Sequence, residues 1–321
     1  MKINWKLLLV AVLALCLLCG CDGSGEGETT QPKVTYPYDF TSEEFFYIKD
    51  CLNYIPTAPL KGVKPDGSFF GLDTYKPEGS EESFYVMQGG CTDGKYMYLL
   101  MEGSDVQIDG ATYAKGHVIT KVDMTTWQIV ARTEPLPLGH GNGMCYNPNL
   151  GQLVVAMCND IADTPEDETR MVAFVDVDTM ELAGTRKLDL AIYAIDYNAK
   201  RDLYVVGIKG NSAAFAVLDS DFVELGYYPG NVLGLGSQDV DCDDNYIFVG
   251  NSGVTTMPGM EVVKVYDWNG EYVGIFRVDS VSEQEAIFNY DGKYYITFYT
   301  GNGGRVYEIE YDFSLLAEIS E

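Results

Sequence analysis

Seven polar side chains have the residue types needed to hold or cleave a polar ligand. They lie in five short segments that begin at residues 87, 139, 191, 237 and 283. These side chains are Gln88, His140, Asn142, Tyr193, Gln238, Asp239 and Glu285. Amides, phenols, imidazoles and carboxylates exchange hydrogen bonds with sugars and peptides. If the fold brings the five segments to one place, they form a ligand-binding funnel.

Two of the seven could also support catalysis. Asp239 and Glu285 come from adjacent segments, and paired carboxylates that flank a sugar bond are the arrangement found in glycosidases. His140 could act as a base, although a histidine beside two glycines is more often structural. A purely structural alternative is that these groups hydrogen-bond neighbouring strands and ordered water. We expect binding without catalysis.

Metal and cofactor chemistry has little support in the sequence. The two histidines, His117 and His140, lack the spacing of metal ligands. Calcium is the alternative, because hard oxygen ligands cluster at Asp239, Asp241, Asp243 and Asp244. That segment lacks the loop glycine and terminal glutamate of an EF-hand. No metal site and no cofactor are therefore expected.

Two interleaved series of similar segments repeat along the chain. One series carries an acid followed by a short polar turn, at Asp123, Asp176, Asp219, Asp267 and Glu310, with spacings of 53, 43, 48 and 43 residues. The other carries Asp-, Asn- and Gly-rich turns and begins at residues 91, 145, 196, 242 and 289. Both turns are flanked by alternating apolar residues, which is the pattern of β-hairpins.

Together the two series predict an all-β fold of five units with four strands each. We number them unit 1 (84–133), unit 2 (139–188), unit 3 (192–228), unit 4 (235–278) and unit 5 (283–319). Four-stranded units of this length are typical of β-propeller blades. The sequence therefore predicts a five-bladed β-propeller over 81–321. A β-sandwich and a six-bladed ring that recruits residues 34–80 are the alternatives.

In this propeller the polar segments become the innermost strands. GHGNGMC (139–145) is then the inner strand of unit 2, and His117 is a strand residue. We expect one equivalent position on the inner strands to hold Cys91, Cys145, Asp196, Cys242 and Asn289. The polar residues before that position would converge on the axis, where binding sites of propellers form.

The first 80 residues are predicted to precede the propeller. Residues 1–20 have a charged start and an apolar run of the kind found in secretory signals. Residues 21–33 are a polar, flexible tether. Residues 34–80 form an N-terminal cap or extension, with a short helix expected over 41–55 and loops around its prolines.

Leu18-Cys19-Gly20-Cys21 resembles the lipobox of bacterial lipoproteins. The resemblance implies cleavage before Cys21, lipidation of that cysteine and an extracytoplasmic protein anchored to the bacterial membrane. Cys19 departs from the Ala, Ser or Thr usual at its position, and an ordinary cleaved signal peptide is the alternative.

Charge and cysteine content limit the partners and the redox chemistry. The chain has 21 basic and 48 acidic residues, a net charge of −27. This charge repels nucleic acid and anionic lipid headgroups, so contact with the membrane is expected through the lipid alone. Five cysteines follow Cys21, an odd number without a CxxC pair, which does not indicate a disulfide framework.

Three segments carry a resemblance to a known family: QGGCTDGKYMYLLME, PLPLGHGNGMCYNPNLGQLVV and QEAIFNYDGKYYITFY. They are similar to the propeller proteins related to helveticin-type class III bacteriocins. The resemblance implies recognition of a cell-envelope component, with Gln88, His140, Asn142 and Glu285 as the matching residues. A lipid anchor departs from a secreted bacteriocin and favours a surface-retained binder. A fainter likeness is to plant-type glutaminyl cyclases, whose metal pattern is not evident.

We therefore expect a cell-surface lipoprotein whose propeller binds a glycan, a cell-wall component or a protein partner. The first alternative is an extracytoplasmic hydrolase or transferase that acts on glycans or peptides through Asp239 and Glu285. The second is a structural lipoprotein that docks a larger envelope complex by its outer surface.

Overall fold

The computed structural model describes residues 55–108, 110–158, 169–210, 214–230, 235–253, 261–280 and 282–311. These residues belong to one compact unit, 36–321. The predicted signal, tether and Cys21, and all but the last residue of the predicted helix over 41–55, lie outside them. Within the described ranges no helix is long and apolar enough to cross a membrane.

Units 1 to 4 each contain four strands that pair antiparallel in the order of the sequence. Unit 1 comprises β4 (Phe84–Thr92), β5 (Tyr96–Gly103), β8 (His117–Asp123) and β9 (Gln128–Arg132). Unit 2 comprises β10 (Gly143–Asn147), β11 (Gln152–Ala156), β12 (Met171–Asp176) and β13 (Leu182–Lys187). Unit 3 comprises β14 (Ile192–Asn198), β15 (Leu203–Ile208), β16 (Phe215–Asp219) and β17 (Glu224–Tyr228). Unit 4 comprises β18 (Gly236–Cys242), β19 (Tyr246–Ser252), β20 (Glu261–Asp267) and β21 (Tyr272–Val278).

A small hairpin interrupts unit 1 between its second and third strands. It pairs β6 (Val106–Ile108) with β7 (Ala111–Tyr113) as a separate two-stranded sheet. The repeat pattern did not predict this insertion, because it has no counterpart in the other units.

Unit 5 is completed by residues from the beginning of the described chain. Its own strands are β22 (Glu283–Tyr290), β23 (Lys293–Tyr299) and β24 (Gly303–Ile309). β2 (Leu60–Gly62) and β3 (Phe70–Asp73) pair antiparallel with the outer edge of β24, and β1 (Thr57–Ala58) pairs parallel with β21. The segment predicted as a cap thus contributes strands to the last two units. Its predicted boundary at residue 80 does not separate it from their sheets.

Aspartate turns form the hairpins between the third and fourth strands of units 1 to 4. The carboxylate of Asp123 accepts the backbone N–H groups of Thr125 at 2.8 Å and Thr126 at 2.9 Å. The equivalent residues Asp176, Asp219 and Asp267 accept amides two to four residues ahead in the same way. Local side-chain bonding of this kind fixes a turn without help from distant residues, and it confirms these hairpins.

Large apolar side chains between successive units form the core. Five clusters of buried residues each combine strands of two units: 1 with 2, 2 with 3, 3 with 4, 4 with 5, and 5 with 1. The inner strands follow the same order of contact, namely β4–β10, β10–β14, β14–β18, β18–β22 and β22–β4. One parallel residue pair, Gly303 with Val86, also links β24 to β4.

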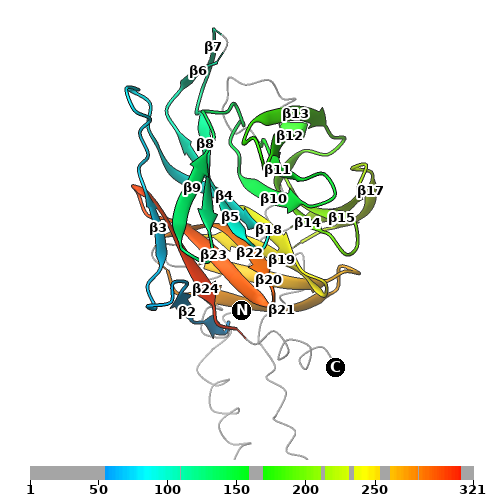
Figure 1. The fold of residues 1–321 in the computed structure, drawn as a ribbon. Coiled ribbons are helices and arrows are strands. Elements are labelled where there is room, and N and C mark those ends of the chain that lie inside the picture. The colour runs from blue at the N-terminus through cyan, green and yellow to red at the C-terminus, as the bar shows by residue number, and fades with distance from the viewer. Residues whose placement is uncertain are drawn as a thin grey trace, which may run out of the picture. The chain divides into compact units, whose positions relative to one another are not determined.

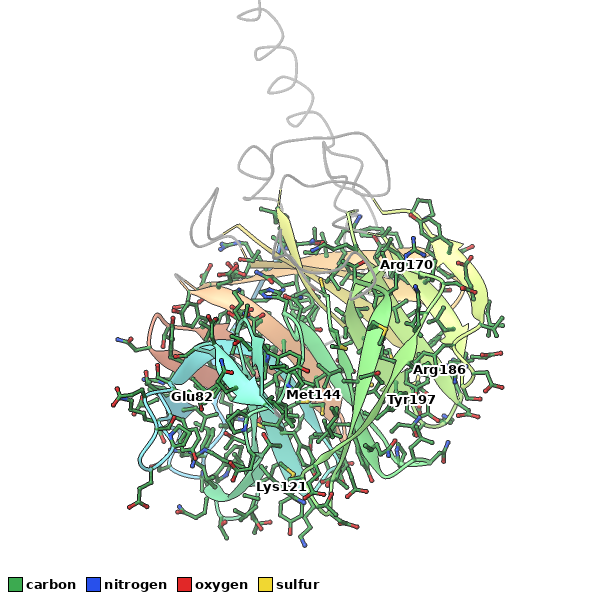
Figure 2. The ribbon with its side chains drawn as sticks, turned by 90° about the horizontal axis from the view of Figure 1, so that it is seen from above. Glu82, Lys121, Met144, Arg170, Arg186 and Tyr197 are labelled. Carbon is green, nitrogen blue, oxygen red and sulfur yellow. The ribbon has the colours of Figure 1, made fainter. Side chains whose placement is uncertain are left out.

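This all-β arrangement of four-stranded antiparallel sheets packed face to face is that of a β-propeller. Figure 1 shows the first strands of the units, β4, β10, β14, β18 and β22, gathered in the middle, with β9, β13 and β17 farther out. Seen from above in Figure 2, Met144 of β10 lies near the centre, whereas Glu82 and Arg186 lie toward the periphery. The inner strands are therefore the place to look for a site.

Candidate functional site

Four of the five inner strands contain a β-bulge near their first residues. The pairing register skips one residue between Met87 and Gly89, Ile192 and Ala194, Ser237 and Asp239, and Gln284 and Ala286. The skipped residues are Gln88, Tyr193, Gln238 and Glu285, all of which the sequence analysis selected. A bulge turns its extra side chain away from the ladder and is common beside active sites. We call this end of the inner strands the bulge end.

The fifth inner strand reaches the bulge end by a different route. β10 begins at Gly143, so Gly139 to Asn142 form a turn before the strand. GHGNGMC is thus only partly the inner strand that the sequence predicted. A Cβ atom on Gly141 would lie 2.9 Å from Cδ2 of Leu100 and 3.0 Å from Nε2 of His117, and its φ is +65°. Only glycine fits this position, which places Asn142 directly before β10.

A buried histidine fixes the same turn. Nε2 of His117 donates to the backbone oxygen of His140 over 3.0 Å. His117 is fully buried on β8, and burial lowers its pKa to about 4, so the ring is neutral. His117 is a strand residue, as predicted. In addition it positions the turn that carries His140.

Glu102 on β5 connects the turn to two basic side chains. It lies 3.0 Å from Nδ1 of His140 and 3.0 Å from Nζ of Lys115. Burial alone would raise the pKa of Glu102, but the hydrogen bonds from His140 and Lys115 lower it. Glu102 is therefore an ionised carboxylate at the bulge end. Neither Glu102 nor Lys115 belongs to a repeated motif, so no pattern in the sequence marks them as site residues.

Amide groups link three of the units at the bulge end. Nδ2 of Asn142 donates to the backbone oxygen of Gln238, and Nε2 of Gln238 donates to Glu283. All three residues are at least partly buried. Asn142, Gln238 and Glu283 thus form one chain of hydrogen bonds across units 2, 4 and 5, as the predicted convergence requires. Glu283 is a further member that the sequence analysis did not select.

The proposed catalytic acids have different surroundings. Oδ2 of Asp239 accepts the backbone N–H of Ile287 over 2.8 Å, which joins β18 to β22. Glu285 is 3% exposed and has no hydrogen bond or ion pair with any residue of the described ranges. Burial raises the pKa of both carboxyls well above the usual value. A role for the two as a catalytic pair remains a prediction.

Further polar atoms at the bulge end are buried without a partner in the described residues, namely Oε1 of Gln88, the hydroxyl of Tyr193 and the side-chain amide of Gln284. Oε1 of Gln88 makes no hydrogen bond within the described residues, and the side chain is 5% exposed. Tyr193 is equally buried, and burial raises its pKa, so it is a neutral phenol. Buried polar atoms are almost always paired, so an unpaired one calls for an explanation.

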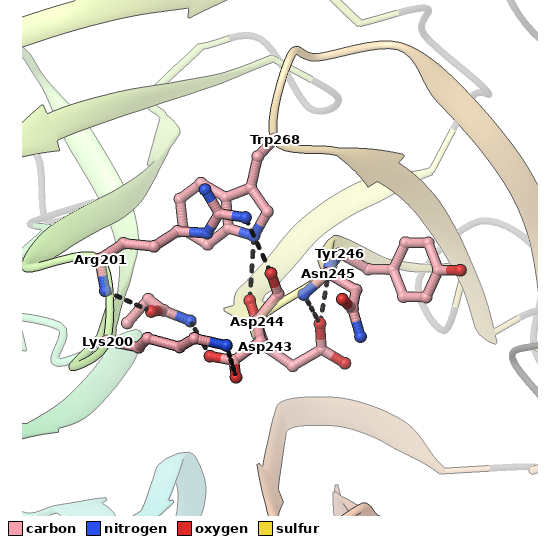
Figure 3. Close-up of polar contacts among 8 residues, drawn as sticks. Lys200, Arg201, Asp243, Asp244, Asn245, Tyr246 and Trp268 are labelled. Atoms are coloured by element: carbon pink, nitrogen blue, oxygen red, sulfur yellow. Dashed lines mark hydrogen bonds and ion pairs between the residues drawn. The ribbon is translucent and has the colours of Figure 1, made fainter.

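The opposite end of the inner strands encloses a cavity of about 440 Å³. We call it the turn end, because the turns after the inner strands surround it. Its lining includes Cys91, Asp196, Asp241, Cys242 and Asn289. Asp196 accepts the N–H of Cys242 at 2.8 Å, and Nδ2 of Asn289 donates to Asp241 at 3.0 Å. Figure 3 shows the rim, where Lys200 pairs with Asp244 at 2.8 Å and Trp268 donates to the backbone oxygen of Asp243.

The register corrects the predicted equivalence of five inner-strand residues. Counted from the residue after each bulge, and from Gly143 in β10, the position of Cys91 is held by Cys145, Asp196, Asp241 and Phe288. Cys242 and Asn289 lie one residue later. The error arose because the cysteine and the Asn were used as markers, whereas the bulges set the register.

The described residues contain no group of three or more His, Cys, Asp or Glu side chains that could hold a metal ion. Cys91, Cys145, Cys158 and Cys242 are buried free thiols. Burial raises the pKa of Cys91, Cys145 and Cys242 well above the usual value, so these thiols are protonated. Calcium binding by Asp239, Asp241, Asp243 and Asp244 remains a prediction.

Comparisons with known proteins identify no family for the sequence. No family model matches the sequence, and no curated protein matches it. Among solved structures, hydrazine synthase of Kuenenia stuttgartiensis is similar at 15% identity with a TM-score of 0.39. The similarity covers 70% of this chain and 59% of that one, so the chain spans less than two thirds of its length. No function is transferred from it.

Proposed function

We propose that units 1 to 5 are the blades of a closed, five-bladed β-propeller. The cyclic order of the five apolar clusters and of the inner-strand contacts supports this count. In this arrangement β2 and β3 serve as the outer strand of the fifth blade. The predicted extension then completes the ring and does not form a sixth blade.

We propose that the protein is a non-catalytic binder that recognises its ligand at the bulge end of the axis. The observation that carries this proposal is the register: four inner strands bulge at the same place, and the four extra residues are Gln88, Tyr193, Gln238 and Glu285. Repeated bulges with polar side chains have no evident benefit for the stability of a purely structural ring. In a binding site they provide four hydrogen-bonding side chains along the axis.

A glycan or another cell-wall component suits this set of groups best, with a protein partner as the alternative. Amides, a neutral phenol and carboxyl groups complement hydroxyl and amide groups of a ligand. The likeness to helveticin-type propellers points the same way. The lipobox-like sequence before Cys21 supports anchoring at the cell surface, where such ligands are found.

Direct binding tests the proposal. The full-length protein is titrated with muropeptides, cell-wall polymers and host glycans, with and without calcium. Saturable binding that is lost in Asn142→Ala and in Gln88→Ala supports the site. Gln128→Ala, at an exposed glutamine of β9, is the matched control and should bind normally. Binding that survives both bulge-end variants would place recognition elsewhere on the molecule.

A further inference from the structure

The bulge end holds more acid than its own basic groups neutralise. Glu102 has two basic partners, Lys115 and His140. Glu283 is bonded to the neutral amide of Gln238, and Glu285 has no partner within the described residues. Glu261 on β20 joins them from unit 4, where it accepts the N–H of Gln284 at 3.0 Å. Buried carboxyl groups without positive partners are costly.

Several buried polar atoms at the bulge end have no partner in the described residues. Oε1 of Gln88 and Oε1 of Gln284 are acceptors, whereas the hydroxyl of Tyr193 and Nε2 of Gln284 can donate. Gln88 is 5% exposed and Glu285 is 3% exposed. A ligand that satisfies these atoms must supply hydrogen-bond donors as well as acceptors. Because the charged groups around Glu285 are acids, a donor group that carries positive charge fits beside it.

We propose that the ligand of this site carries a primary ammonium group, which binds against Glu285 and Glu283 with Gln88 as an additional acceptor. An ammonium has three donors and a compact charge, which matches one carboxylate pair and one amide oxygen. The proposal rests on the proposed function and narrows its ligand class to amine-bearing sugars or peptides. The net charge of −27 favours the approach of such a ligand.

The protonation of Glu285 gives the proposal a distinctive signature. Burial, followed by the neighbouring acids Glu283, Glu261, Glu102 and Asp239, raises the pKa of Glu285 well above its usual value. Without a neighbouring cation, Glu285 is therefore the neutral acid. An ammonium stabilises the carboxylate, so binding at neutral pH should release a proton.

A matched pair of probes tests whether the protein recognises a free amine on its ligand. The glucosamine tetramer carries free amines, and the N-acetylglucosamine tetramer has the same backbone with the amines blocked. We expect the full-length protein to bind the free-amine probe tighter by about tenfold or more, because a hydrogen bond to a charged group is worth that much. Calorimetry in buffers of different ionisation heat should show proton release with the free-amine probe alone.

Variants separate a specific site from general attraction to an acidic protein. Glu285→Gln keeps the shape of the side chain and should lose about tenfold in affinity for the free-amine probe, with no change for the acetylated one. Glu283→Gln should lower the affinity for the same probe. Glu81→Gln, at a fully exposed acid, should change nothing.

Each other result overturns the inference in a recognisable way. If both probes bind equally and Asn142→Ala abolishes this binding, recognition of an ammonium group is refuted. The proposed function is then still supported. Tighter binding of the amine that is unchanged in Glu285→Gln would be surface attraction only. Calcium binding that depends on Glu285 without amine binding would make the site a metal site. Binding of neither probe would refute the amine, and the wider ligand panel would then decide the proposed function.

Discussion

The two ends of the inner strands are built from similar residues and used differently. At the turn end, Asp196, Asp241 and Asn289 bond to one another's strands, so their polar groups are satisfied. At the bulge end, Oε1 of Gln88 and the hydroxyl of Tyr193 are buried without partners in the described residues. Polar groups that stabilise a fold form hydrogen bonds within the protein, whereas groups that bind a ligand can lack a partner in the protein. This contrast is the reason why we propose the binding site at the bulge end.

The largest expected effect concerns the pH dependence of stability. Glu261 is fully buried, and burial raises its pKa from 4.5 to about 7. Between these values the unfolded chain has lost the proton that the folded protein keeps, so stability falls as pH rises. The loss from this group is about 3 kcal/mol across that range. Urea unfolding at several pH values should show a flatter profile in Glu261→Gln.

The control for this prediction is Glu81→Gln, because that side chain is fully exposed. Its pH profile should match that of the unsubstituted protein. If Glu261→Gln also keeps the full pH dependence, Glu261 is not a protonated acid in the folded state. The bulge end would then tolerate a carboxylate at this position better than we infer.

A second expected effect is steric and tests how closely the inner strands approach. A Cβ atom on Gly143 would lie 2.7 Å from Cα of Ala194 and 2.9 Å from the backbone nitrogen of Ile195. Gly143→Ala should therefore destabilise the protein by about 2 kcal/mol, as overpacking does. Gly236→Ala is the control, since its Cβ would lie 3.6 Å from the nearest atom. Equal melting temperatures for the two variants would contradict the close contact of β10 with β14.

Removing a turn-end carboxylate should cost stability and leave binding intact. Asp243 accepts the amides of Asn245 and Tyr246, both at 2.6 Å, and the hydroxyl of Tyr294. Asp243→Ala should lower the unfolding free energy by about 1–2 kcal/mol, measured by urea denaturation. The ligand found in the binding panel should still bind with unchanged affinity. A loss of binding without a loss of stability would reverse the assignment of the two ends.

The smallest expected effect on stability is at the bulge end. Gln88→Met removes a buried acceptor that has no partner in the described residues and keeps the volume of the side chain. Stability should stay the same or rise by up to about 1 kcal/mol, because an unsatisfied polar group is removed. Ligand binding should be lost in the same variant. A marked loss of stability would show that Gln88 is structural.

Local chemistry explains why much of the fold was predictable from sequence. The turns at Asp123, Asp176, Asp219 and Asp267 are closed by their own side chains, so they leave a signal in a few consecutive residues. The same holds for Asp93 and Asp243 after the inner strands. The periodic spacing of these turns defined the units and put the seven polar residues on or beside their inner strands.

Long-range features were not predictable in the same way. The pairing of β2 and β3 with β24 joins residues at least 230 positions apart, and no local pattern encodes it. The ion pairs of Glu102 depend on a turn 38 residues away. Cys242 and Asn289 lie one residue beyond the position equivalent to Cys91, and an alignment on residue type could not reveal this, because the pairing between strands sets the register.

The pairing of β2 and β3 with β24 also sets an order of events during synthesis. Residues 57–73 emerge from the ribosome early, but their partners at 272–278 and 303–309 are made much later. Until then the early strands have no sheet to join, and unit 1 lacks its neighbour, unit 5. Completion of the sheets is thus a late folding step that only a full-length chain can take. A product that stops before residue 303 would retain unpaired edges, which is the form that proteases and chaperones recognise.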